Sequence, residues 1–412
     1  MNDRINFDPF DPKTRQDAPE EFAKLARQCP IHRYRGRFDF FIENDPAYIS
    51  GVMLKDPAIW TVEKGSAPTP LPSELRTRIM MDGPSHAKIR HVVQRGFTAQ
   101  DLARLKAIVE QLANELIDTM LAIPGGNGDF FELFAMPLPG RFMCLMLGAP
   151  EKDYRTYNAW AEDYFYSINN EPGVRGEESM ERMRQVTTSL FQLIAERHAM
   201  IKNRGLERDL SLVGTALPND FLSRFMCEKI DGEYLEDMEI LTLMIAIIIG
   251  GNETTMSLIG NLLWRLLEVR ERWMMLEADP SLIEVAIEEC LRLDPPVLGM
   301  CRTPRSELAL HGVSIPAEAK VLYNISAVNR DPAVWANPEE FRLDRPLSSL
   351  RRHASFGGGL HLCLGAPLAR MEVKTVFEVL IRRLPNLRLA GEAVGARGFS
   401  VWGKTKLPVT WQ

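Results

Sequence analysis

The 412-residue sequence lacks the patterns that mark several large classes of protein. It has only six cysteines, irregularly spaced and without a CxxC pair, so we expect neither a zinc or dithiol site nor the disulfide framework of a small secreted domain. The formal net charge is only −6 with both signs mixed, which gives no support to nucleic-acid binding. No internal repeat or low-complexity segment is present. A globular protein of a reducing cytoplasm is therefore expected.

Long apolar runs are also missing. The longest extends from Ile240 to Ile249, is interrupted only by Thr242, and is flanked by Glu239 and Glu253. Because a membrane-spanning helix needs about 20 apolar residues, this run predicts a buried core helix instead. The N-terminal segment has no apolar stretch of the kind found in signal peptides, so we expect neither a targeting segment nor a membrane anchor.

Helical periodicity of the apolar residues dominates the chain. The predicted helices are Ala18–Gln28, Asp45–Leu54, Ser85–Phe97, Gln100–Ile123, Tyr154–Ile168, Glu177–Asn203, Leu235–Glu268 and Glu284–Leu293, and a further one that follows Cys363 and ends near Arg383. Short alternating runs between Arg302 and Asn324 predict small strands, and residues 329–355 predict a long structured loop. Since no linker divides the chain, we expect residues 1–412 to form one domain, mainly α with a minor β portion.

The most specific segment extends from Phe356 to Gly365 and reads FGGGLHLCLG. Glycines before Cys363 permit turns with positive φ and let backbone N–H groups approach the sulfur. The cysteine also lies just before a predicted helix, whose N-terminal dipole favours a thiolate over a thiol. A thiolate in a glycine cradle is what axial ligation of a haem iron requires. A buried, inert cysteine beside a glycine turn is the other interpretation of this segment alone.

A second unusual segment, IGGNETT at residues 249–255, lies late in the predicted apolar helix. Gly250 and Gly251 each cost about 1 kcal/mol in mid-helix relative to alanine, and a bulky ligand pressed against the helix would explain them. Thr254 can hydrogen-bond to a preceding carbonyl and loosen the helix. Glu253 supplies an acid beside that alcohol, and such a pair can deliver protons to bound dioxygen. A helix kink without any catalytic role is the alternative interpretation.

Two further patterns place charged groups on one face of a predicted helix. Glu289 and Arg292 are three residues apart, which by itself is usually a solvated ion pair. His86 and Arg90 are four apart, and Arg302 stands at the start of the first predicted strand. Cations of this kind make charge-assisted hydrogen bonds to carboxylates.

These segments, taken in order along the whole chain, resemble the motifs of the cytochrome P-450 family. The family's cysteine-ligand loop is matched by Phe356, Gly357, Gly359, His361, Cys363 and Gly365. Its oxygen-activation motif is matched by Gly250, Gly251, Glu253 and Thr254, with Gly250 where alanine is more frequent. Its ExxR helix and the arginine that joins it are matched by Glu289, Arg292 and Arg345. Its haem-propionate contacts are matched by His86, Arg90, Arg302 and His361.

The resemblance implies a mostly helical, triangular fold with haem b bound between the helix that ends near Glu268 and the helix after Cys363. It also implies a monooxygenase reaction, in which dioxygen (O₂), two electrons and two protons insert one oxygen atom into a substrate and make water. The Glu289, Arg292 and Arg345 side chains would form a buried structural knot. By the family's layout, the substrate-facing residues are Leu71, Leu75, Ile79, Met80, Met244, Ile247, Val297, Leu298, Met300, Phe399, Val401 and Trp402, and their apolar character favours a small hydrophobic substrate.

The chain has no flavin or nicotinamide fingerprint and no iron–sulfur cysteine cluster, so its electrons must come from other proteins. Resemblance to the soluble bacterial members implies a monomer served by a ferredoxin and a ferredoxin reductase, with NAD(P)H used only indirectly. Cations that would receive the ferredoxin are Lys88, Arg95, Arg104, Arg351 and Arg352.

Two other functions remain open at this point. A peroxide-dependent haem-thiolate peroxygenase would use the same cysteine, but such relatives usually dispense with the pair that Glu253 and Thr254 form. A haem-binding gas or redox sensor would need only Cys363 and a pocket, together with an output module that this sequence lacks.

Overall fold

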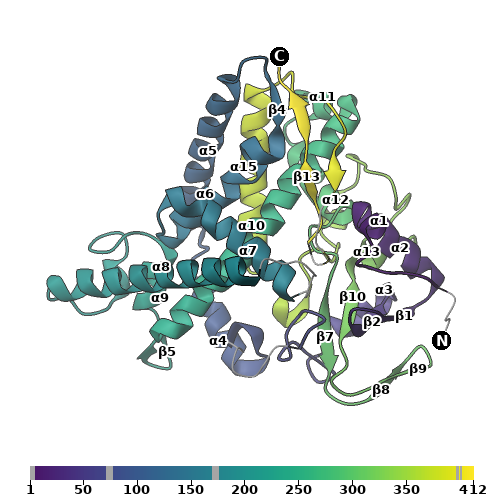
Figure 1. Cartoon of the computed structure of the whole chain (residues 1–412), viewed down its shortest axis with the longest axis horizontal. Helices are drawn as coiled ribbons and strands as arrows, with labels where there is room; N and C mark the ends of the chain where they lie inside the picture. The colour runs from purple at the N-terminus through teal and green to yellow at the C-terminus, as the bar shows by residue number, and fades with distance from the viewer. Residues whose placement is uncertain (1–4, 71–77, 169–175, 396–398, 400) are drawn as a thin grey trace.

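The longest helix, α10 (Asp237–Glu268), runs through the middle of the molecule (Figure 1). It contains the apolar run noted above, and most of its apolar side chains are buried or half-buried, as predicted for a core helix. Within the part of the chain that the structure describes, it is also the one helix long and apolar enough to cross a membrane, although more than half of its most apolar stretch is buried by the rest of the protein. The structure is a computed structural model that describes residues 5–70, 78–168, 176–395, 399 and 401–412.

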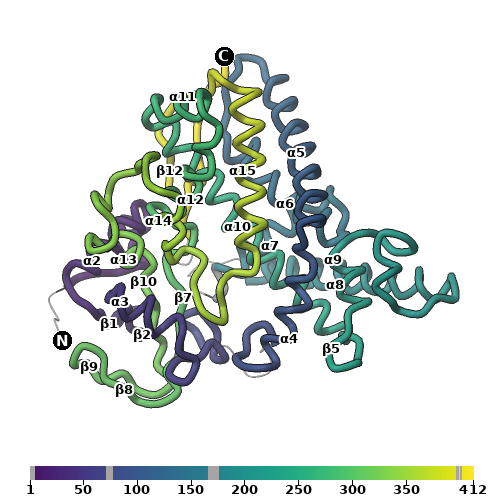
Figure 2. Tube along the Cα trace, turned by 180° about the vertical axis from the view of Figure 1, so that it is seen from behind, coloured from purple at the N-terminus to yellow at the C-terminus, as the bar shows by residue number. Residues whose placement is uncertain are grey.

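A layer of helices surrounds α10 and gives the molecule its triangular outline (Figures 1 and 2). The helices that contact α10 are α6 (Pro137–Leu147), α7 (Tyr154–Ile168), α8 (Gly176–Asn203), α9 (Phe221–Cys227), α11 (Arg270–Ala278), α12 (Leu282–Leu293) and α15 (Ala366–Arg383). Outside them, α5 (Ala99–Leu121) packs along α15. Its buried residues Leu105, Val109, Leu112 and Leu116 recur at helical spacing and form the apolar stripe that makes this contact possible.

Shorter helices and single turns connect these elements. The short α-helices are α1 (Pro12–Gln16), α2 (Ala18–Gln28), α3 (Pro46–Tyr48), α4 (Gly83–Gln94), α13 (Ile325–Asn329) and α14 (Leu347–Leu350). π-Helical turns cover Ile49–Met53 and Phe131–Ala135, and 3₁₀ turns cover Arg78–Met80, Glu151–Asp153, Leu210–Leu212 and Gly359–His361.

The main sheet lies on the side of the molecule away from α8 (Figure 1). Its five strands follow the order β1-β2-β10-β7-β3, with β10 parallel to β2 and antiparallel to β7. These strands are β1 (Ile31–Arg35), β2 (Asp39–Glu43), β3 (Trp60–Thr61), β7 (Gly299–Pro304) and β10 (Val321–Asn324). The smaller sheets combine β4 (Asn127–Asp129) with β11 (Arg388–Leu389) and β14 (Pro408–Thr410), β5 (Lys229–Ile230) with β6 (Glu233–Tyr234), β8 (Leu308–Leu310) with β9 (Val313–Ile315), and β12 (Val394–Gly395) with β13 (Lys404–Lys406).

The mainly helical fold with a minor β portion is confirmed, and the predicted helices are present with ends shifted by a few residues. The segment predicted as one helix over Asp45–Leu54 is α3 followed by a π-helical turn. Arg302 lies inside β7 and not at its start. The sequence did not predict α6, whose prolines and glycine obscure its helical pattern, nor β2, which is buried on both faces and so shows no alternation.

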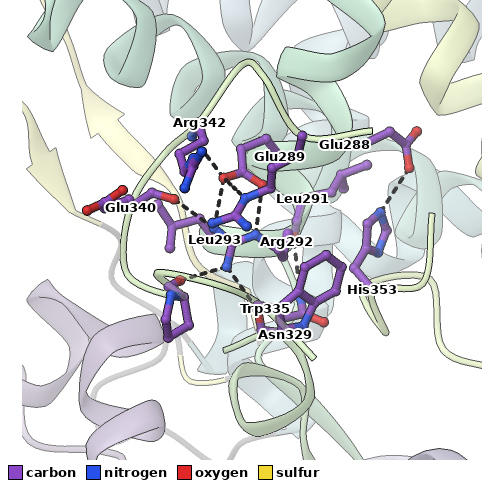
Figure 3. Close-up of polar contacts among 12 residues, drawn as sticks. Glu288, Glu289, Leu291, Arg292, Leu293, Asn329, Trp335, Glu340, Arg342 and His353 are labelled. Carbon is purple, nitrogen blue, oxygen red and sulfur yellow. Dashed lines mark hydrogen bonds and ion pairs between the residues drawn. The ribbon is translucent and has the colours of Figure 1, made fainter. Parts of the chain in front are cut away.

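A buried charge cluster joins α12 to the long loop that follows β10 (Figure 3). The guanidinium of Arg292 donates two hydrogen bonds, of 2.7 and 2.8 Å, to the Glu289 carboxylate, and Arg345 donates a third of 3.0 Å. Arg292 also donates to the backbone carbonyl oxygens of Asn329, Pro338 and Glu340. The side chains of Glu289 and Arg292 have no exposed surface, so every charge here must be matched by a partner.

Replacing Arg292 with leucine is expected to lower the free energy of unfolding by about 3–5 kcal/mol, because the Glu289 carboxylate would remain buried with only part of its compensation. Urea unfolding followed by circular dichroism measures the change. The matched control is Lys24→Gln on α2, which breaks only exposed ion pairs to Glu20 and Glu21 and should cost less than about 1 kcal/mol. Equal costs for the two variants would contradict the role of burial.

Candidate active site

The cysteine loop is a tight turn that leads into α15. The backbone N–H of Cys363 donates to the Phe356 carbonyl oxygen at 2.9 Å, which closes the loop across its base. Gly357 and Gly359 adopt positive φ values of 70° and 62°, conformations that side chains disfavour. A Cβ atom at Gly359 would lie 2.0 Å from the Leu54 carbonyl oxygen, so only glycine allows the loop to pack here.

The Cys363 sulfur is the best-placed ligand for a soft metal in this region. Among the six cysteines, Cys363 is the one exposed residue, whereas the others are buried or half-buried. Burial of its sulfur nevertheless raises the pKa of the thiol. Backbone N–H groups of Gly365 and Ala366 and the positive charges of Arg90 and Arg370 lower this pKa, but the effect of burial is larger. The N–H groups that reach the sulfur thus follow the cysteine, while the glycines before it shape the turn.

The predicted oxygen-activation segment lies in the middle of α10, where the lack of a side chain serves a different purpose at each of two glycines. A Cβ atom at Gly250 would meet nothing within 4 Å, and this residue is exposed, which leaves space for a ligand. A Cβ atom at Gly251 would lie 2.8 Å from the Met143 sulfur, so this glycine allows α6 to pack on α10 and not a ligand, in contrast to the prediction. The Thr254 hydroxyl donates to the Gly250 carbonyl oxygen at 2.7 Å, as predicted.

The neighbouring acid, Glu253, is kept protonated by its surroundings. Burial, together with the negative charge of Glu162 on α7, raises the pKa of Glu253 to about 8. A carboxyl group with this pKa is neutral at pH 7 and can donate a proton. The same turn of α10 is tied to α7 because the Asn252 amide donates to the Asn158 side-chain oxygen at 2.9 Å, and both residues are buried. Sequence reasoning missed Asn158 and Glu162.

Three of the four residues predicted to bind propionates lie together. The imidazole rings of His86 and His361 are 4.3 Å apart, and Arg90 donates to the backbone carbonyl oxygens of Leu360 and Leu362. Arg302 lies on β7 with its guanidinium 5.0 Å from the Tyr323 ring. Sequence reasoning assigned no role to Asp82, the residue directly before α4, which accepts a hydrogen bond of 2.8 Å from His361.

The donors and the free space on these elements fit a haem. His86 is buried, and burial, aided by the charges of His361 and Arg90, lowers its pKa to about 4. Within the described residues its ring makes no hydrogen bond, so the N–H of the neutral ring is available to donate to an anionic partner. A cysteine near backbone N–H groups, open space beside Gly250 on α10 and cationic groups near the loop are what a flat macrocycle with two carboxylates requires.

The residues predicted to contact the substrate differ in how deeply they are buried. Ile79, Met80, Ile247 and Val297 are half-buried, and Met300 is exposed, so all five can contact a ligand. Met244 and Leu298 fill the hydrophobic core with almost no exposed surface, as do Phe399 and Trp402; for these four residues the prediction is corrected, because their surroundings are protein. Val401 is also mostly buried and forms an isolated bridge with Val297. Leu71 and Leu75 lie outside the described residues.

Comparison with known proteins gives one consistent result. The family model described as Cytochrome P-450 matches residues 33–386. The cytochrome P-450 monooxygenase PikC of Streptomyces venezuelae is 29% identical over 95% of this chain and 90% of its own length. The mycinamicin IV hydroxylase/epoxidase of Micromonospora griseorubida is 31% identical over 81% of this chain and 79% of its own length.

Solved structures agree with the sequence relatives. The polyketide synthase cytochrome P-450 PksS of Bacillus subtilis superposes with a TM-score of 0.85 at 25% identity, covering 99% of this chain and all of that one. A second cytochrome P-450, CREJ, superposes with a TM-score of 0.86, which shows the fold alone because the identity is 23%. The chain therefore belongs to the cytochrome P-450 family and is a monooxygenase of the bacterial type.

Proposed function

We propose that Cys363 supplies the axial thiolate of haem b and that the haem lies between α10 and α15. The observation that carries this proposal is the position of Cys363, an exposed residue three positions before α15 in a loop shaped by glycines, where neighbouring backbone N–H groups and two arginines stabilise its thiolate. When bound, the haem with O₂ as co-substrate supplies the oxygen-insertion chemistry, and electron donation from the thiolate favours cleavage of the O–O bond. The residues in register around the sulfur, Phe356, Gly357, His361 and Gly365, would complete the loop's contact with the cofactor.

Side chains of this chain would bind the haem carboxylates and deliver the protons. We assign His86, Arg90, Arg302 and His361 to the two haem carboxylates, which their charge and hydrogen-bonding capacity suit. Thr254, whose hydroxyl donates to the Gly250 carbonyl oxygen, lies on the turn of α10 next to the open space at Gly250, where a small molecule would bind. Glu253, neutral at pH 7, donates the proton from beside this turn.

The substrate is proposed to be a small hydrophobic organic molecule that is hydroxylated or epoxidised. The half-buried or exposed residues available for contact are apolar: Ile79, Met80, Ile247, Val297 and Met300. Relatives named mycinamicin IV hydroxylase/epoxidase and pentalenic acid synthase support this substrate class, which includes terpenoid, aromatic and alkyl compounds.

Electrons are proposed to come from a ferredoxin that is reduced by a NAD(P)H-dependent ferredoxin reductase. Of the five candidate cations for its docking, Lys88, Arg95 and Arg104 take part in ion pairs with acidic side chains of this chain. Arg351 and Arg352 are exposed and, within the described residues, have no acidic partner, so they are the better candidates. We further propose a cytoplasmic monomer in which residues 1–412 form one catalytic domain.

The first prediction of the proposed function concerns the bond between Cys363 and the haem iron. The purified, dithionite-reduced protein treated with carbon monoxide is expected to show a Soret band at the strongly red-shifted position of a thiolate-ligated haem, because sulfur donates electron density to the iron. Cys363→Ala should abolish this band completely, whereas the control variant Cys29→Ala should retain it. A band that survives in Cys363→Ala would contradict the proposed ligand.

The second prediction concerns proton delivery by Glu253. Because its pKa is about 8, the donor form is present at neutral pH and is lost as the pH rises through 8. The yield of product per NAD(P)H consumed should fall over this range in the wild type, and Glu253→Gln should be about 100-fold less active without this pH dependence. Glu162→Gln removes a charge that raises the pKa of Glu253, so it should move the fall to lower pH; an unmoved profile would contradict the assignment.

The third prediction concerns the electron donor. The double charge reversal Arg351→Glu and Arg352→Glu should slow ferredoxin-supported turnover about tenfold at low salt, since steering by opposite charges raises the association rate. The control Arg35→Glu on β1 should leave turnover unchanged. Turnover with hydrogen peroxide should be unaffected by either change. Efficient peroxide turnover without any ferredoxin-supported activity would favour the peroxygenase alternative instead.

A further inference from the structure

Helix α12, which carries the buried charge cluster of Glu289 and Arg292, has a second buried carboxylate, Glu288, that points to the opposite side. Glu288 precedes Glu289, and the two side chains point away from each other, Glu289 toward Arg292 and Glu288 toward His353 (Figure 3). Only 2% of Glu288 is exposed, so its charge also needs compensation. This second carboxylate has no part in the functions assigned above.

Glu288 is compensated by one cation and one imidazole. The Arg370 guanidinium, from the second turn of α15, donates two hydrogen bonds to the two Glu288 oxygens at 2.5 and 2.9 Å. His353 lies with its Nε2 atom 3.0 Å from Glu288, and its Nδ1 atom accepts a hydrogen bond from the Ser355 backbone N–H, so Nε2 carries the hydrogen that is donated to Glu288. Burial acts to raise the pKa of Glu288, but these hydrogen bonds hold it at about 2, and the group stays ionised at every physiological pH.

Arg370 connects this pair to the cysteine loop. Its guanidinium lies 4.5 Å from the Phe356 ring, and the His353 ring lies 5.8 Å from the same ring. The Phe356 carbonyl oxygen in turn accepts the hydrogen bond from the backbone N–H of Cys363. The path from α12 to the sulfur therefore runs through one ion pair, one cation–π contact and one backbone hydrogen bond.

Arg370 also acts on the sulfur through its charge. Together with Arg90, it is one of two cations whose positive charge acts on the Cys363 sulfur. Glu288 is paired directly with this cation and carries the opposite charge, so it opposes the cation's field. The net potential at the sulfur thus depends on how the two opposite charges are balanced.

We propose that Glu288 and Arg370 form a charge pair that sets the reduction potential of the haem bound to Cys363, with Phe356 as the contact that holds the cysteine loop against it. The proposal rests on the haem-thiolate function proposed above. Reduction adds an electron to the iron, so a more positive field at the sulfur raises the potential and a more negative field lowers it. Loss of the Glu288 charge should therefore raise the reduction potential, and loss of the Arg370 charge should lower it.

The test is a spectroelectrochemical titration of the haem-loaded protein. Glu288→Gln keeps an oxygen for His353 but removes the negative charge, so at a fixed electrode potential the ratio of reduced to oxidised haem should rise at least threefold. Arg370→Gln should lower that ratio at least threefold, and the double variant should return close to the wild type. A tenfold change in the ratio corresponds to about 59 mV for a one-electron couple.

The same two helices offer a matched control. Glu284 and Lys374 form an ion pair between α12 and α15, each four residues from the proposed pair and more exposed. Glu284→Gln and Lys374→Gln should change the ratio by less than twofold. If Arg370→Gln does not bind haem, Arg370→Lys replaces it. Because lysine keeps the charge, its ratio of reduced to oxidised haem should stay within twofold of the wild type. The direction of the Glu288→Gln shift then tests the proposal by itself.

Shifts of the same sign in Glu288→Gln and Arg370→Gln, or shifts no larger than those of the control pair, would overturn the proposal, because a merely structural role predicts no opposition of sign. Failure of the underlying function would be recognised separately. In that case the wild-type protein itself would lack the red-shifted Soret band of its carbon monoxide complex, and no titration could be made.

Discussion

The need to match buried charge on α12 shapes the whole region behind the cysteine loop. Two adjacent carboxylates, Glu288 and Glu289, are almost fully buried, and each would cost several kcal/mol if left alone. Glu289 is compensated by Arg292 and Arg345, and Glu288 by Arg370. These partners come from the helix itself, from the long loop and from α15. The ion pairs that compensate the buried carboxylates therefore also hold three distant parts of the chain together.

This arrangement explains how a loop with little regular structure can hold Cys363, the proposed metal ligand, in a fixed position. Arg292 donates to three backbone carbonyl oxygens of the segment after β10, and Asn329 holds the next part through the Ala354 N–H and the Ser355 hydroxyl. The chain reaches Phe356 already positioned, and the remaining turn to Cys363 needs only glycines and one backbone hydrogen bond. Stiffness thus comes from hydrogen bonds to the backbone and not from helix or sheet.

The opposite requirement holds on α10. There the intrinsic helix propensity is low, because Gly250 and Gly251 lie in mid-helix. Gly250 is exposed, and Thr254 donates a hydrogen bond to its carbonyl oxygen. Neighbouring helices support the weak turn from outside: Met143 of α6 fits against Gly251, and Asn158 of α7 bonds to Asn252. A cysteine loop fixed by hydrogen bonds and a helix with a low intrinsic propensity at its glycines are therefore combined in one molecule, each stabilised by long-range contacts.

Much of this protein was determined by its sequence alone. The apolar periodicity predicted the main helices, and the motifs around Cys363, Glu253–Thr254 and Glu289–Arg292 indicated the family, because such patterns depend on local geometry and on residues close in the chain. Only the tertiary structure decided which partners those residues meet. Glu162 raises the pKa of Glu253 from another helix, Arg370 shares Glu288 with His353, and Met244 turns into the core although its neighbour Ile247 does not. These outcomes depend on packing between segments far apart in the chain, and periodicity does not encode which faces will meet.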